Sequence, residues 1–430
     1  MKRWFDLVGA GFLGAMIFCI IFPKFLNLLI RSEFLFLATA LFFGRGFTRA
    51  PLSLLYFSIA SAYVLIGLNS PILPGVVKAD FYHIIFSGGL GVVLAVDRMR
   101  PQELAQFILN LNRFVACAAV VGAVLGLVKL VALTRGIELG YALVSEAGVY
   151  PPGSSLHNDY NLFALALTYG AVACLWLPKN EHLPQMQSMV DIGLPLLVAA
   201  TLTSTSRRGA ICVVFLSVIY FYRAIINKRA AAGHQQSSFS RGVWIFLFLG
   251  YLYYKRSDIA LFWNEFLGSF EFQNLSFRMQ TVGTAELFVS RLTYWDRAWE
   301  LVDHFSLGDY VLGTGFDYVW TMGDISGNEQ DYPHNIFLSA LLYGGILQLG
   351  LTLVMLATAL KKTFSGGNLT FSLFYWMLID VIFLFFSSNS VFSSLLLSAL
   401  ILIALTINTQ KSEKMALPQS PALSEPRGRA

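Results

Sequence analysis

Long apolar runs recur along most of this chain, and they constrain its fold more than any single motif. Of the 430 residues, 56% are hydrophobic and only 13% are charged, whereas a soluble domain averages about 25% charged residues. A helix needs roughly 20 apolar residues to cross a bilayer, and in lipid its backbone groups must be satisfied within the protein. The sequence therefore predicts an all-α, polytopic membrane protein.

We expect about twelve transmembrane helices. Their approximate cores are 7–22, 34–43, 51–68, 80–96, 106–133, 160–177, 189–203, 209–226, 243–254, 335–360, 371–386 and 390–407. The chain then divides into residues 1–254 with the first nine spans, a large polar loop at 255–334, residues 335–407 with the last three spans, and a disordered tail at 408–430.

The orientation follows from lysines and arginines, which favour the cytoplasmic side in short connections. Alternate connections are enriched in these residues, and the pattern places both termini in the cytoplasm. Three features then share the outer face: the loop 134–159, the turn at Arg207 and Arg208, and the loop 255–334. The net charge of +5 reflects these connections and does not indicate a nucleic-acid partner.

The turn before the eighth span carries two arginines on the side where the positive-inside rule disfavours them. Ser204, Thr205 and Ser206 precede Arg207 and Arg208. Hydroxyl side chains, guanidinium groups and the N–H groups of a helix start form a site suited to phosphate oxygens. The alternative is a pair of charges that extend to lipid headgroups.

The long loop holds the second group of candidates. An amphipathic helix on the membrane surface is expected over 288–304, because of the spacing of Arg291, Trp295, Trp299 and Val302. Arg291 is either an anion ligand or a salt-bridge partner of Asp296 or Glu300. The glycines of Gly313-Thr314-Gly315-Phe316 favour a tight turn over a phosphate loop, since they lack the length and the lysine of such a loop.

His334 follows Pro333 where the loop meets the next apolar run. A neutral imidazole at this place is able to take a proton from a hydroxyl, and a helix cap or an interfacial histidine is the alternative. His157, which precedes Asn158 and Asp159, is a weaker candidate for the same role. The four cysteines lie inside apolar runs without metal-ligand spacing, so we expect no metal site and no cofactor.

Several of these motifs occur in the order seen in the O-antigen ligase and polymerase superfamily, which this chain resembles. They are Ser206-Arg207-Arg208-Gly209-Ala210, then Ser290-Arg291 with Trp295, then Gly313-Thr314-Gly315-Phe316, then His334-Asn335 with Gly345. The resemblance is clearest over 200–350, and the twelve-span layout extends it over most of the chain. The family usually has a single arginine before Gly-Ala, whereas this chain has two, and Tyr343 and Gln348 also depart from the family pattern.

The resemblance implies a GT-C-like, metal-independent glycosyltransferase of the bacterial inner membrane, with its active site facing the periplasm. The donor would be a glycan on undecaprenyl diphosphate. The acceptor would be lipid A–core for a ligase, which we favour, or a second lipid-linked glycan for a polymerase.

Carried over to this chain, the resemblance gives roles to particular residues. Arg207 or Arg208, together with Arg291, would bind the diphosphate, and His334 would activate the acceptor hydroxyl. Substrate contacts would come from Trp295, Trp320, Tyr332 and Asn335.

Two rivals belong to other classes. A transporter or flippase predicts two related halves and charges along a path through the membrane, but the sequence shows no half-repeat. A non-catalytic scaffold for polysaccharide assembly would leave His334 dispensable.

Overall fold

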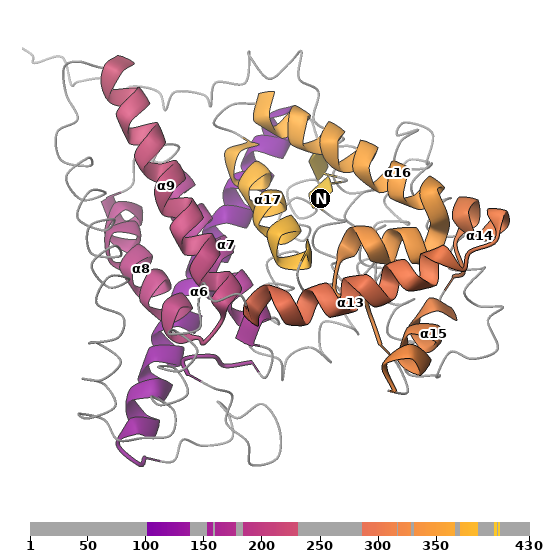
Figure 1. Cartoon of the computed structure of the whole chain (residues 1–430). Coiled ribbons are helices and arrows are strands. Elements are labelled where there is room, and N and C mark those ends of the chain that lie inside the picture. Colours follow the sequence, from indigo (N-terminus) through magenta and orange to yellow (C-terminus); the bar gives the residue numbers. More distant parts are fainter. Residues whose placement is uncertain are drawn as a thin grey trace, which may run out of the picture.

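The computed structural model describes residues 101–137, 153–157, 160–177, 184–230, 286–315, 317–327, 331–365, 370–385, 400–401 and 403–404. Within these ranges the chain is helical and contains no β-strand (Figure 1). The expected helical class is confirmed there. The spans expected before residue 100 and at 243–254 lie outside the described residues, and so does the tail, so the count of twelve stays a prediction.

Five of the described helices form a bundle: α6 (Pro101–Thr134), α7 (Tyr160–Trp176), α8 (Pro184–Thr203), α9 (Arg207–Ala230) and α17 (Phe371–Phe385). α7 lies at its centre and contacts the other four. Every residue from Phe163 to Cys174 is buried, as befits a helix that is apolar on all sides. Its carbonyl at Tyr169 accepts a hydrogen bond of 3.0 Å from the indole Nε1 of Trp376 on α17.

Two of the described helices are long and apolar enough to cross a membrane, at Ala105–Thr134 and Ile336–Ser365. The first lies within α6, which packs against α7 and α8. The exposed side chains of α6 include the apolar residues Phe114, Val121, Val124, Val128 and Val131. An apolar face turned away from the protein suits lipid, because hydrocarbon solvates it and water does not.

α16 (Ile336–Ser365) is broken by two consecutive glycines, where one span over 335–360 was expected. Gly344 has φ −130° and ψ 18°, and Gly345 has φ 64° and ψ −164°, a combination that glycine alone adopts readily. The first segment therefore ends near Tyr343, and a second segment of residues 346–365 follows. At 1.5 Å per residue the second segment is about 30 Å long, which matches the hydrocarbon core of a bilayer.

The break in α16 is closed by the glycine turn that follows α14 (Leu307–Leu312). The backbone N–H groups of Thr314 and Gly315 donate to the carbonyls of Leu342 and Tyr343, both at 2.9 Å. These carbonyls lie directly before the non-helical glycines, so the turn supplies hydrogen-bond donors where the helix departs from its regular geometry. The turn is thus a structural clamp, as the sequence favoured over a phosphate loop.

The described part of the long loop contains three helices, α13 (Glu286–Asp303), α14 and α15 (Asp317–Ser326). α13 matches the helix expected over 288–304. With α15 and the first segment of α16, it encloses a second core that includes Ala298, Tyr318, Met322 and Leu342. In the view of Figure 1, α13 runs across the ends of α9 and α17.

Candidate functional site

Arg207 and Arg208 are the first two residues of α9. Ser206 caps this helix, because its Oγ accepts the N–H of Gly209 at 3.1 Å and its carbonyl accepts the N–H of Ala210. Both arginines are half-buried, and the Nε of Arg207 and the Nη1 of Arg208 are closed off from solvent. A helix N-terminus and two guanidinium groups therefore meet at this place, an arrangement that favours a negative charge.

The turn before α9 is fixed by hydroxyl groups and by an unusual backbone conformation. Ser204 Oγ donates to the carbonyl of Thr201 at 2.7 Å, and Ser206 Oγ donates to Asn161 Oδ1 at 3.0 Å. Thr205 has φ 66°, a left-handed conformation that residues other than glycine seldom adopt. The Ser-Thr-Ser sequence thus holds the two arginines in place through its own hydrogen bonds.

The segment 153–157 packs directly against this turn. The N–H of Ser154 donates to the carbonyl of Thr203 at 3.1 Å, and its Oγ donates to the carbonyl of Ala200 at 2.7 Å. A Cβ added to Gly153 would lie 2.1 Å from the carbonyl oxygen of Thr203, so only glycine allows the approach. Two of the three features expected on one face, the end of the loop 134–159 and the arginine turn, are therefore in contact.

Lys129 is a residue of this region that the sequence analysis missed. It lies in α6 and is fully buried, and its Nζ donates to the carbonyl of Ser155 at 2.6 Å. The lysine thereby ties α6 to the segment that supports the arginine turn. A lone cation inside a run of apolar residues was the signal that could have identified it, because ionisable residues inside spans are rare and usually have a function.

His157 is held within the same segment. Ser155 Oγ donates to the carbonyl of His157 at 2.7 Å and accepts its N–H at 3.2 Å. These contacts fix the backbone of the histidine, whose side chain is half-buried. Asn158 and Asp159 lie outside the described residues.

His334 lies just before α16, with a φ of 51°. Its ring meets the ring of Tyr294 on α13 in an edge-to-face contact, with centroids 4.9 Å apart and planes at 84°. The helix cap that was the alternative role for His334 belongs to Asn335, whose Oδ1 accepts the N–H groups of Phe337 and Leu338 at 2.9 and 3.2 Å. Asn335 is 4% exposed, so its side chain serves the start of α16.

An ion pair connects α13 to the segment that carries His334. Arg297 Nη1 lies 3.6 Å from Asp331 Oδ2, and the Arg297 guanidinium also lies over the ring of Tyr294, at 5.7 Å. Asp331 Oδ1 accepts the N–H of Tyr332 at 2.8 Å. A chain of contacts therefore runs from Asp331 through Arg297 and Tyr294 to His334.

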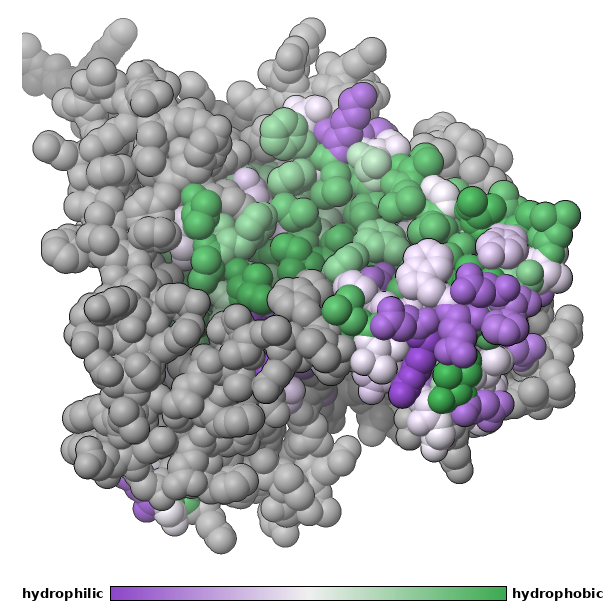
Figure 2. All heavy atoms as spheres, in the orientation of Figure 1, coloured by the Kyte–Doolittle hydropathy of each residue, from purple (hydrophilic) through white to green (hydrophobic). Residues whose placement is uncertain are grey.

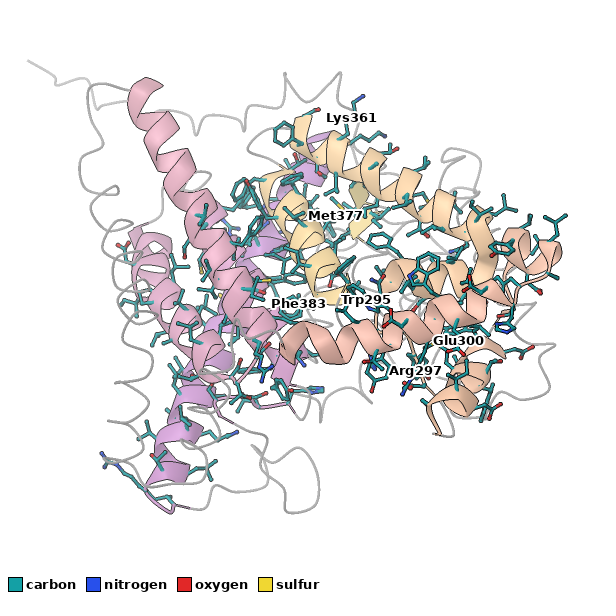
Figure 3. The ribbon with its side chains drawn as sticks, viewed as in Figure 1. Trp295, Arg297, Glu300, Lys361, Met377 and Phe383 are labelled. Carbon is teal, nitrogen blue, oxygen red and sulfur yellow. The ribbon has the colours of Figure 1, made fainter. Side chains whose placement is uncertain are left out.

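The aromatic candidates have different surroundings. Trp295 lies against Phe385 at the end of α17, with ring centroids 5.3 Å apart, and Figure 3 shows it on the side of α13 opposite Arg297. Tyr332 is half-buried against the second core. Its burial, with a smaller contribution from Asp331, raises the pKa of the Tyr332 hydroxyl, so this group stays protonated and able to donate. Trp320 is half-buried on α15.

α17 contacts both the helix that carries Arg291 and the helix that begins at Arg207. α13 carries Arg291 one turn before Trp295, and Trp295 contacts Phe385 of α17. α17 in turn packs against α9, which begins at Arg207. Of Arg291 itself the structure describes only the backbone, so the choice between an anion ligand and a salt bridge to Asp296 or Glu300 stays a prediction.

Comparisons with protein-family models, with curated proteins and with solved structures found no match.

Proposed function

We propose that this chain is a membrane glycosyltransferase of the O-antigen ligase type, which moves a glycan from undecaprenyl diphosphate to lipid A–core on the outer face of the inner membrane. The proposal includes twelve spans and rests on the resemblance of its motifs. One observation carries it furthest: His334 is held against α13, the helix on which Arg291 lies, although 43 positions separate the two residues. A base and an anion ligand from separate motifs thus belong to one assembly.

In the proposed reaction, the acceptor hydroxyl oxygen attacks the anomeric carbon of the donor glycan. The bond from that carbon to the diphosphate oxygen breaks, and undecaprenyl diphosphate leaves with the electron pair. Arg291 and one of the arginines at the start of α9 stabilise the negative charge that develops on the leaving group. His334 takes the proton of the hydroxyl and later releases it to water.

The local structure suits both roles. The arginines at the start of α9 combine fixed guanidinium charge with the positive end of a helix dipole. His334 lies between Asp331 and Asn335, whose side chains hold the backbone on either side of it through hydrogen bonds. Fixed positions matter because a catalytic group must meet its substrate within hydrogen-bond reach.

The proposal is tested by reconstitution. The purified chain would be placed in proteoliposomes with a glycan on undecaprenyl diphosphate, and either lipid A–core or a second lipid-linked glycan would be offered as acceptor. A ligase transfers to lipid A–core and a polymerase to the lipid-linked glycan, and either product is seen as a mass increase. The absence of both products, with a donor that a known ligase accepts in parallel, contradicts the proposal.

A further inference from the structure

α14 is a short helix whose apolar side chains are exposed. None of its residues is buried, and its exposed side chains include Leu307 at 84%, Leu312 at 59%, Tyr310 and Val311. Its one acid, Asp309, closes a capping box, with Oδ2 accepting from the N–H of Ser306 at 3.1 Å and from its Oγ at 2.7 Å. The acid is therefore used in the helix start, and the exposed surface of α14 is apolar.

α14 cannot move independently of α16. A Cβ added to Gly313 would lie 2.3 Å from the carbonyl oxygen of Tyr343, and one added to Gly345 would lie 2.4 Å from the carbonyl of Val311. The backbones of the two elements are thus in direct contact in both directions. Together with the hydrogen bonds from Thr314 and Gly315, this contact fixes α14 at the start of the second segment of α16.

The apolar surface of α14 continues onto that second segment. Ile346 and Leu347, the first residues after the break, are 61% and 54% exposed, and Leu353 and Val354 extend the exposed surface along the helix. We call Leu307, Leu312, Ile346 and Leu347 the α14 patch. In Figure 2 hydrophobic residues cover the region of α16 and α17, whereas the large group of hydrophilic residues lies over α13 and α15.

We propose that the α14 patch lies in the lipid bilayer, at the level between headgroups and acyl chains on the outer face. The occupant is lipid because the patch is continuous with the exposed apolar residues of a helix that is long and apolar enough to cross a membrane. The second segment of α16 has the length of the hydrocarbon core, so its first residues belong at the edge of that core. A short helix clamped there, with apolar side chains and a tyrosine, fits the interface.

This inference concerns how the loop meets the membrane; it rests on the topology of the proposed function but does not depend on the proposed reaction. It is tested in the full chain, with the four natural cysteines replaced by alanine and a single cysteine labelled with an environment-sensitive fluorophore. The protein would be placed in nanodiscs with lipids brominated either high on the acyl chains or near their ends. Leu307→Cys and Leu312→Cys are the test positions, and Asp324→Cys on the exposed face of α15 is the matched control.

The α14 labels are expected to lose most of their fluorescence with bromine high on the chains and less with bromine near the ends. The label at Asp324 should keep its fluorescence with both lipids. A label at Val354, which is 64% exposed on α16, reports whether the span itself contacts lipid and should be quenched most by the deeper bromine. Quenching at Leu307 and Leu312 no greater than at Asp324 would overturn the inference, and so would a blue-shifted label that neither lipid quenches, since another protein surface would then cover the patch.

Discussion

His334 adopts a backbone conformation that few residues other than glycine tolerate. A left-handed φ costs a non-glycine residue on the order of 1–2 kcal/mol, and such strain persists where the surrounding structure enforces it. Here the enforcing contacts are the cap at Asn335 and the ring of Tyr294. The strained residue is also the proposed base, which makes its side chain the first one to test.

Replacement of His334 by asparagine or glutamine should abolish transfer and leave the protein folded. The side chain of neither residue can take the hydroxyl proton, so we expect a loss of about 10²–10⁴-fold in rate. His334→Asn controls for the backbone, because asparagine accepts a left-handed conformation better than most residues. Transfer and donor binding would be measured on the same purified variants. A His334→Gln variant that transfers glycan at the parent rate would show that the histidine only positions the substrate.

Arg291→Lys should be nearly as inactive as Arg291→Ala. A lysine supplies a point charge, whereas the guanidinium fork of arginine binds two phosphate oxygens at once. The measurement is donor affinity together with the rate of transfer, at fixed salt. Of the adjacent pair, Arg208→Ala should cost more than Arg207→Ala, because Arg208 directly precedes Gly209-Ala210. Full activity in Arg291→Lys would show that the positive charge suffices at this position and that the guanidinium fork is not needed.

Loss of Arg297 should destabilise the segment that carries His334. Among the described residues Arg297 is the ionic partner of Asp331, whose side chain is 8% exposed. Breaking a fully buried ion pair costs roughly 3–5 kcal/mol, and because Arg297 is 30% exposed we expect about half of that for Arg297→Met. Thermal unfolding in detergent measures the effect. The double variant with Asp331→Asn should recover part of the loss, and strictly additive losses would show that the two side chains do not interact.

At the scale of elements, the break in α16 and the turn after α14 depend on each other. The glycines on both sides carry no side chain, so the two backbones approach closely, and the turn donates two hydrogen bonds of 2.9 Å to carbonyls of α16. The first segment of α16 can thereby lie within the loop region, while the second has the length of a span. The break thus places His334 and Asn335 beside α13, where a straight helix would have carried them along the axis of the span.

Alanine at Gly313 or Gly345 should destabilise the protein strongly. Both glycines have positive φ, 72° and 64°, and an added Cβ would meet backbone atoms that cannot move aside. The strain alone is worth about 1–3 kcal/mol at each position. Gly350 is the control, since an added Cβ there meets nothing within 4 Å and alanine should stabilise a helix by about 0.5–1 kcal/mol. Equal unfolding temperatures for the three variants would contradict the clamp.

At the scale of the whole molecule, the described helices form one bundle around α7 and a loop assembly around α13 and the first segment of α16. α17 belongs to the bundle by its contacts with α7 and α9, and it meets the loop assembly through Phe385. The arginines at the start of α9 belong to the bundle, whereas Arg291 on α13 and His334 before α16 belong to the loop assembly. The proposed site requires that the loop lies on the outer side of the membrane, where the proposed lipid-linked donor would be presented.

The proposed topology places residues 255–334 outside and both termini inside. A cysteine at Glu300, which is exposed on α13, should react with a membrane-impermeant thiol reagent in intact spheroplasts. A cysteine at Ser412 in the tail should react only after lysis. The reverse pattern would invert the orientation derived from lysine and arginine, and labelling of both positions before lysis would place the two on the same side.

The sequence by itself determined the helical class and several element positions, because apolar runs and helical spacing are local properties. α6 and α13 lie where the apolar and amphipathic patterns placed them, and the glycine turn at 313–315 is a turn. The count of spans and the reaction remain predictions from the sequence.

Only the tertiary structure decided where the expected span at 335–360 breaks, because two glycines in an apolar run look like any others until another element packs against them and donates hydrogen bonds to the carbonyls beside them. The same reason applies to Lys129 with Ser155, to Arg297 with Asp331 and to His334 with Tyr294. Each pair is separated by 26 to 40 positions, as the sequence numbers show. A contact over such a separation depends on how helices pack, and local sequence patterns do not encode that packing.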